Sequence, residues 1–269
     1  MVYLYNVLPQ MFGLMTKWAS SVENATASNL IFVFAWLLCA VSAYLLGSLN
    51  SAIIVSTYKY KQDIRNFGSG NAGLTNMHRV YGKDGALLTL AGDIGKQVVS
   101  VLIGVILLGQ TGAYFAGAFC MIGHIFPVFY KFKGGKGVLT AATMILLIDP
   151  MEFAVLFCLF ALVLLVTRYV SLSSIIAALT YPATHKIATE FRTGHAPQAF
   201  ELFFTLFVGL LVIYMHRSNI FRIFNNQESK FSFRKKPEAQ EILDMEDKEN
   251  DSDNTYYPPA TNKGKKKRK

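Results

Sequence analysis

Charged residues are scarce over two long stretches of this chain of 269 residues. No Lys, Arg, Asp or Glu lies between Glu23 and Lys59, and none lies from Gln97 to Tyr130. A transmembrane helix needs about 20 apolar residues in a row, whereas a water-soluble core does not need apolar runs of this length. The missing charge therefore argues against a soluble globular fold and predicts a polytopic, all-α integral membrane protein.

Cysteine is also rare. The three cysteines, Cys39, Cys120 and Cys158, lie far apart without Cys-x-x-Cys spacing, and each falls in a predicted helix. We interpret them as small buried hydrophobic residues. No cluster of His, Cys and carboxylate residues has the spacing of a metal site, and no Gly-x-Ser-x-Gly elbow presents a nucleophile. We therefore predict no metal and no cofactor.

The apolar segments predict about seven transmembrane helices. We place them at 29–57, 85–109, 113–130, 138–148, 153–167, 172–187 and 199–215. Turn residues at Gly112, at Asp149-Pro150 and at 192–197 separate some of them. Eleven basic residues fall in one set of loops and three in the other. The positive-inside rule then predicts an outer N-terminus and a cytoplasmic C-terminus in a plasma membrane.

Composition divides the chain into three parts. Residues 1–28 form an N-terminal extension, 29–227 form the membrane domain, and 228–269 form a charged tail. The tail has too few apolar groups to fold and is predicted to be disordered. Its lysine-rich end, 263–269, has the composition to bind anionic lipid or nucleic acid. We favour a solvated tail that helps to set topology, and predict no nucleic-acid partner.

Glycine is concentrated in two polar runs, Gly-Ser-Gly-Asn-Ala-Gly-Leu-Thr-Asn at 68–76 and Phe-Lys-Gly-Gly-Lys-Gly-Val at 132–138. Glycine allows tight turns that expose backbone N–H groups to an anion, and neighbouring basic side chains favour phosphate. The first run fits the letters of a dinucleotide fingerprint, but the polar segment before it is no β-strand. In the second run Gly137 stands where a Walker A loop needs Ser or Thr.

Other polar residues are predicted to lie on the same face of the membrane domain as the two glycine-rich runs, the cytoplasmic face. They are Ser69, Asn71, Thr75, Asn76 and Arg79, then Lys133 and Lys136, then Arg168, Ser171, Ser173 and Ser174, and finally His216, Arg217, Ser218 and Asn219. We interpret Lys59, Lys61, Lys131 and Arg222 as interfacial side chains at helix ends. Asp93 and Lys96 lie one helical turn apart; an intrahelical ion pair and an inward-facing polar role both remain open.

The segments 68–76, 127–140, 168–174 and 216–220 resemble, in order and spacing, the signature segments of the bacterial acyl-phosphate:glycerol-3-phosphate acyltransferases of the PlsY type. The resemblance covers roughly 43–228. It implies a seven-helix membrane enzyme that moves an acyl group from acyl phosphate to the 1-hydroxyl of glycerol-3-phosphate. The products would be 1-acyl-glycerol-3-phosphate (lysophosphatidic acid) and phosphate, in the first acylation of phospholipid synthesis.

The resemblance also implies residue roles. Catalytic roles would fall to Ser69, Arg79, Lys136, His216 and Asn219. Phosphate binding would fall to Gly68, Gly70, Asn71, Gly134, Gly135, Gly137, Arg168, Ser171 and Ser174, with Lys96 and Glu228 as further candidates. The chain departs from the family pattern at Asn50, Leu74 and Gln97, where the family usually has Pro, Ala and Gly.

Two other functions fit the sequence less well. A transporter of an organophosphate would be expected to show internal repeats and polar residues near the bilayer midplane, and neither is evident. An acyltransferase with a thioester donor commonly pairs His with Asp four residues later, a spacing that His78, His124 and His216 lack. The expected partners are therefore glycerol-3-phosphate, acyl phosphate and membrane lipids.

Overall fold

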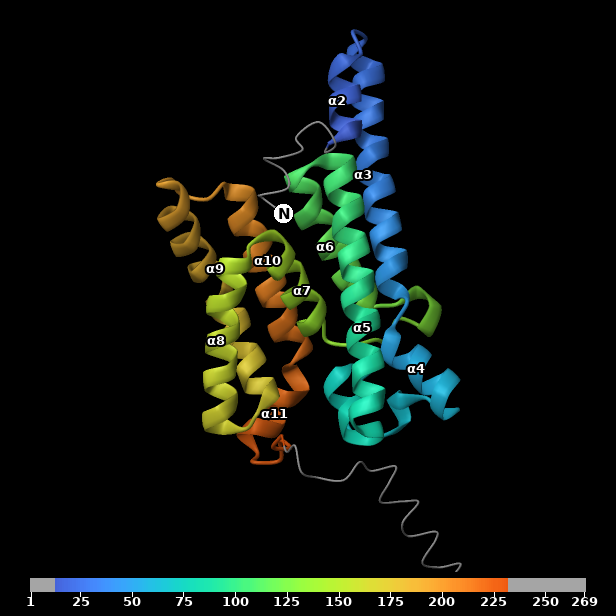
Figure 1. The fold of residues 1–269 in the computed structure, drawn as a ribbon, viewed down its shortest axis with the longest axis vertical. Helices are drawn as coiled ribbons and strands as arrows, with labels where there is room; N and C mark the ends of the chain where they lie inside the picture. Colours follow the sequence, from blue (N-terminus) through green and yellow to red (C-terminus); the bar gives the residue numbers. More distant parts are fainter. Residues whose placement is uncertain (1–12, 232–269) are drawn as a thin grey trace, which may run out of the picture.

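The computed structural model describes residues 13–231, and every regular element among them is helical (Figure 1). The longer helices are α3 (Ala25–Ser48), α5 (Leu74–Leu108), α6 (Gln110–Ile125), α7 (Val138–Ile148), α8 (Pro150–Thr167), α9 (Val170–Thr193) and α10 (Ala199–Met215). The shorter ones are α2 (Leu14–Ser21), α4 (Ser51–Tyr60) and α11 (Arg217–Phe224), with 3₁₀ turns η2 (Ile64–Asn66) and η3 (Val128–Tyr130). The predicted all-α class is confirmed, and α7 and α10 have the predicted bounds.

Four helical segments of the described part are long and apolar enough to cross a membrane: Ala25–Tyr60, Leu74–Leu108, Gln110–Tyr130 and Pro150–Thr167. Together, α10 and α11 would make a fifth, bent by 55°. Helix α7 has only 11 residues, and α9 carries charged residues in its second half. The total of seven spans and the orientation stay predictions. The predicted tail lies outside the described residues from 232 onward.

The first predicted helix is in fact two helices. The chain leaves the helical conformation at Leu49 and Asn50, between α3 and α4. Asn50 is extended, and its side-chain oxygen accepts a hydrogen bond from the backbone N–H of Ile53 at 3.1 Å. This is the geometry of an N-cap, and asparagine is among the best residues for it. An uninterrupted apolar pattern concealed the break.

Helix α5 begins eleven residues earlier than predicted, at Leu74. The sequence prediction left residues 74–84 outside a helix, but they are helical, and the side chains of Lys83 and Asp84 are exposed on the helix surface. The helix is interrupted at Gly82, which has φ 71°, a left-handed value that favours glycine. The last three residues of the first glycine-rich run therefore form the first turn of a helix.

The predicted turn at Gly112 is wrong, because Gly112 lies inside α6 and the chain turns at Gly109. Gly112 and Gly104 of α5 face each other so closely that a Cβ on either would overlap the other's carbonyl oxygen. Small residues let helix backbones approach in this way. The glycine at 112 thus serves helix packing rather than a turn.

The bundle has two halves (Figure 1). Helices α3, α5 and α6 form one, α8, α9 and α10 form the other, and α7 lies between them. An apolar core that includes Tyr114, Met144, Tyr181 and Phe204 joins the halves. At the end of the bundle away from α11, the ion pair between Asp149 and Arg192 and a buried polar cluster tie α8, α9 and α10 together.

Candidate active site

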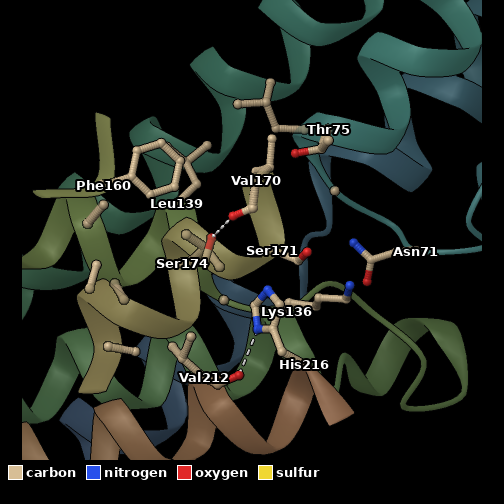
Figure 2. Close-up of a pocket in the computed structure, with 18 of the residues that line it drawn as sticks. Asn71, Thr75, Lys136, Leu139, Phe160, Val170, Ser171, Ser174, Val212 and His216 are labelled. Carbon is tan, nitrogen blue, oxygen red and sulfur yellow. Dashed lines mark hydrogen bonds between the residues drawn. The ribbon is translucent and has the colours of Figure 1, made fainter. Parts of the chain in front are cut away.

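A cavity of about 770 Å³ opens where the two halves meet, at the end near α4 and α11. Polar residues from the first run, from the second run, from the start of α9 and from α10 and α11 line one part of it. Figure 2 shows Asn71, Lys136, Ser171 and His216 gathered there. The predicted residues that line the cavity are Gly68, Ser69, Asn71, Arg79, Lys136, Gly137, Ser171, Ser174, His216, Asn219 and Glu228.

The first glycine-rich run is folded around Asn76, in the first turn of α5. The side-chain oxygen of Asn76 accepts a hydrogen bond from the backbone N–H of Ser69 at 2.9 Å, and its amide nitrogen donates to the carbonyl of Phe67 at 3.0 Å. Gly68 has φ 58°, and a side chain there would collide with Asn76. Ser69 is thereby held at the cavity rim, beside Arg79.

The second glycine-rich run closes the end of α6. The backbone N–H groups of Gly134 and Gly135 donate to the carbonyls of Ile125 and His124, each at 3.1 Å. These two amides therefore satisfy helix-end carbonyls, and neither glycine lines the cavity. Gly137 does line it; with φ 79° it begins α7 and places Lys136 at the cavity wall.

Lys136 belongs to a polar chain that crosses the mouth of the cavity. Its ammonium donates to the Asn219 side-chain oxygen, and the Asn219 amide nitrogen donates to Glu228 at 2.7 Å. Glu228 also accepts a hydrogen bond from the Ser171 hydroxyl at 2.7 Å and pairs with Arg222 at 2.8 Å. This carboxylate thus joins α9, α11 and the segment after α11.

Lys136 and Glu228, which lie at opposite ends of this series of hydrogen bonds, have shifted pKa values. Burial, together with the positive charges of Arg222 and Arg79, lowers the pKa of Lys136 to about 8 against the opposing effect of Glu228. Burial would raise the pKa of Glu228, but hydrogen bonds from Asn219, Ser171 and Arg222 outweigh it and leave that pKa below its usual value. Glu228 is therefore an anion at neutral pH.

His216, buried between α10 and α11, presents one ring nitrogen to the cavity (Figure 2). Its Nδ1 lies 2.8 Å from the carbonyl oxygen of Val212. A carbonyl can only accept, so Nδ1 carries the proton, and in the neutral ring Nε2 is left as the acceptor. The ring is thus oriented as a proton acceptor towards the cavity.

The rest of the cavity is apolar. Leu139 and Phe160 lie on the side away from the polar residues in Figure 2, and further side chains of α7, α8, α9 and α10 extend this lining. Three helices, α5, α7 and α9, also begin at the cavity, where Thr75, Val138 and Ser171 are lining residues. The N-terminus of a helix favours an anion.

Five predicted residues do not line the cavity: Gly70, Gly134, Gly135, Arg168 and Lys96. The Gly70 N–H donates to the Phe67 carbonyl at 3.0 Å inside its own turn. Arg168 is an exposed residue with φ 62° that ends α8. The Lys96 ammonium is occupied by the Asp93 carboxylate at 2.8 Å and by two backbone carbonyls, each at 3.1 Å.

Sequence reasoning undervalued Arg222, Asn76 and His124. Arg222 was assigned to the membrane interface, but it lines the cavity and pairs with Glu228. Its position three residues after Asn219 on one helix, which puts both on the same face, was a usable signal. Asn76 acts by hydrogen-bonding the start of its own run, at Phe67 and Ser69, and His124 acts by contacting Gly135 of the second run; no spacing in the sequence reveals either contact.

Comparison with known proteins places these features in a family. The family model for glycerol-3-phosphate acyltransferase matches residues 37–226. A glycerol-3-phosphate acyltransferase of Thermoanaerobacter pseudethanolicus is 42% identical over 193 residues, which are 72% of this chain and 94% of the relative. One of Ureaplasma urealyticum is 34% identical over 248 residues, 80% of this chain and 98% of the relative.

Solved structures support the same family assignment. The fold is similar to crystal structures of PlsY, an integral membrane glycerol 3-phosphate acyltransferase, in two forms. The glycerol 3-phosphate form has a TM-score of 0.65 at 34% identity and covers 77% of this chain and 98% of that one. The lysophosphatidic acid form has a TM-score of 0.63 at 34% identity, with 74% and 96% covered.

The helical bundle, with basic residues lining its cavity, is thus that of a multi-pass membrane acyltransferase. The chain belongs to the glycerol-3-phosphate acyltransferase family, as the sequence resemblance predicted.

Proposed function

We propose that this protein transfers an acyl group from acyl phosphate to the 1-hydroxyl of glycerol-3-phosphate. The observation that carries the proposal is the cavity, in which a mouth lined by Arg79, Lys136 and Arg222 adjoins an apolar arm. The mouth suits two phosphate groups and the arm suits an acyl chain. Family membership supports acyl transfer to glycerol-3-phosphate.

Binding two phosphates side by side requires positive charge, because like charges a few ångströms apart repel strongly in a poorly hydrated site. Arg79 and Lys136 provide cations on the α5–α7 side, and Arg222 provides one on the α11 side. The beginnings of α5, α7 and α9 add partial positive charge. A metal ion is not needed for this neutralisation, and residues 13–231 contain no cluster of three metal-binding side chains.

The reaction needs no covalent enzyme intermediate, because phosphate is already a good leaving group. The glycerol oxygen forms a bond to the acyl carbon, and the bond between that carbon and the phosphate oxygen breaks. The hydroxyl proton passes to His216 Nε2, which faces the cavity, and from there to the departing phosphate. Holding both substrates in one cavity supplies much of the acceleration.

The apolar arm fixes how the donor is placed in the membrane. Its lining comes from helices that cross the bilayer in the proposed arrangement of seven spans, with the N-terminus outside. The mouth and both glycine-rich runs then lie at the cytoplasmic surface, where soluble glycerol-3-phosphate is available. The acyl chain enters sideways from the lipid while its phosphate reaches Lys136.

The test compares donors with the purified full-length protein in detergent micelles. Glycerol-3-phosphate is incubated with acyl phosphate or with an acyl thioester, and both 1-acyl-glycerol-3-phosphate and free phosphate are measured. We expect product with acyl phosphate alone, at one phosphate per acylated glycerol. Turnover with the thioester would identify the other donor class. Absence of turnover, together with uptake of glycerol-3-phosphate into proteoliposomes, would identify a transporter.

A further inference from the structure

A buried network lies directly behind the two glycine-rich runs, on α5 and α6. The Lys96 ammonium contacts Asp93 at 2.8 Å and His124 Nδ1 at 2.9 Å, and donates to the carbonyls of Gly47 and Leu49. Each of these partners belongs to the protein. An ammonium has only three hydrogens, so none is left for a substrate phosphate, which argues against direct binding by Lys96.

The contacts with Lys96 and Asp93 fix the orientation of the His124 ring. Its Nδ1 lies 2.9 Å from the Lys96 ammonium and 3.5 Å from the Asp93 carboxylate. The Nε2 edge faces Gly135: a Cβ added to Gly135 would overlap Nε2 and lie 2.9 Å from the adjacent ring carbon, Cδ2. The His124 carbonyl also accepts the hydrogen bond from the Gly135 N–H, at 3.1 Å.

The two glycine-rich runs meet at the same point. The carbonyl oxygen of Ala72, in the first run, would be 2.8 Å from a Cβ on Gly135 of the second. The Asn50 side chain donates to that Ala72 carbonyl at 3.3 Å. Gly135 is followed at once by Lys136, so a displacement at this junction moves the cation at the cavity mouth. His124 itself lines the cavity.

We propose that His124 is a positioning residue for the acyl transfer: its ring, anchored by Lys96 and Asp93, holds the second glycine-rich run against the first and so sets where Lys136 meets phosphate. The proposal rests on the proposed function, and it adds His124 to the positively charged residues that line the cavity mouth. It predicts that substitution of His124 weakens the binding of phosphate substrates more than it lowers the stability of the folded protein.

Two variants, His124→Asn and His124→Gln, test the contacts of the two ring nitrogens separately. The side-chain oxygen of Asn replaces Nδ1 and keeps the acceptor for Lys96, but leaves the contact with Gly135 empty. Gln reaches the position of Nε2 and removes the contact at Nδ1, while Lys96 keeps Asp93 and the two carbonyls. We expect His124→Asn to unfold within a few degrees of the wild type and to lose at least tenfold in kcat/KM, chiefly through KM for both phosphate substrates. His195→Asn, at an exposed histidine far from the cavity, is the control and should change neither.

A double-variant cycle with Gly135→Ala tests the contact itself. In the wild-type background the new methyl group collides with His124, so kcat/KM should fall by a hundredfold or more. In a His124→Ala background the ring is absent and only the milder contact with the Ala72 carbonyl remains, so the same substitution should cost at least tenfold less. Contacting residues show such non-additivity, whereas independent sites do not.

Three results would overturn the proposal. They are full activity in His124→Asn, a loss confined to thermal stability, or equal costs of Gly135→Ala in both backgrounds. Direct titration of the wild type and His124→Asn with glycerol-3-phosphate keeps the proposal separate from the reaction. If the wild type binds this ligand tightly but turns over no acyl donor, the proposed function fails while the positioning role is still tested by the affinity of the variant.

Discussion

Lys136 and Lys133 lie three residues apart, and the structure gives them different environments. Lys136 is partly buried, lines the cavity and contacts Asn219, whereas the Lys133 side chain is exposed and its backbone hydrogen-bonds with Arg65 and Tyr130. Lys136→Ala should lower turnover by two orders of magnitude or more, about the effect of removing one charged contact at a reacting centre. Lys133→Ala should cost about tenfold or less. Equal losses in folded proteins would assign phosphate capture to the general charge of the loop.

The shifted pKa of Lys136 predicts a pH dependence. A lysine is charged below its pKa and neutral above it, so its attraction for phosphate is lost as the pH rises through about 8. The kcat/KM of the wild type should therefore fall above that pH, because this parameter reports ionisations of the free enzyme. Lys136→Arg keeps the charge at alkaline pH and should remove the fall, even if its maximal rate is lower. A fall of the same shape in both proteins would assign the ionisation to another group.

Residue patterns predicted many of the polar residues that line the cavity, but few of the hydrogen bonds that they make. Ser69, Arg79 and Asn219 stood out because small and charged residues recur beside long apolar segments. The use of the Gly134 and Gly135 amides to close α6 could not be predicted, because their partners are set by where α6 ends in space. The roles of the predicted residues in the reaction stay predictions until variants are assayed.

At the scale of the helices, glycines on α5 provide a matched test of packing. Gly104 faces Gly112 of α6 without room for a Cβ, whereas Gly95 on the same helix has nothing within 4 Å of that position. Gly104→Ala should lower the free energy of unfolding by about 1–3 kcal/mol through overpacking. Gly95→Ala should be neutral or raise it by about 0.5–1 kcal/mol through helix propensity. Thermal unfolding of both variants in the same detergent checks this; an equal effect at the two sites would refute the close approach of α5 and α6.

The ends of a helix were predictable where an apolar run ends in turn residues. A break between two helices was not predictable where the apolar run continues through it. The ends of α7 are marked by Gly137 and by Asp149-Pro150, and both were found. The break before α4 lies inside an uncharged run, where only the capping bond of Asn50 discloses it. The early start of α5 was missed because charged residues on an exposed helix face resemble a loop in sequence.

For the whole molecule, the segment just after α11 is the last described part that reaches the cavity. Glu228 joins Ser171, Asn219 and Arg222, and the backbone N–H of Phe231 donates to the carbonyl of Arg168 at 2.8 Å. A chain shortened to Lys236 should therefore keep most of its activity.

A chain shortened to Gln227 should lose at least tenfold, because Glu228 and its contacts are removed. Both shortened proteins should be compared with full-length protein for turnover and for monodispersity in detergent. A large loss in the well-folded longer form would contradict the expectation, because it would mean that the charged end after Lys236 contributes to the reaction.

The division of the molecule into two halves gives the cavity its chemistry. The half that contains α5 supplies Ser69 and Arg79, the half that contains α9 and α10 supplies Ser171 and His216, and Lys136 lies between them. An acyl donor held from one half and an acceptor held from the other can meet only inside the cavity. This arrangement predicts direct transfer of the acyl group from bound acyl phosphate to the 1-hydroxyl of bound glycerol-3-phosphate.

Attack of the glycerol oxygen on the acyl carbon, rather than on phosphorus, is tested most sharply by following the oxygen atom of the acceptor. Glycerol-3-phosphate labelled with ¹⁸O in its 1-hydroxyl is turned over with unlabelled acyl phosphate by the purified protein, and both products are examined by mass spectrometry. Direct attack on the acyl carbon predicts that the label is retained in the 1-acyl ester and is absent from the released phosphate. Label in a phosphate product would mean attack at phosphorus, and failure to form the 1-acyl ester would contradict acyl transfer altogether.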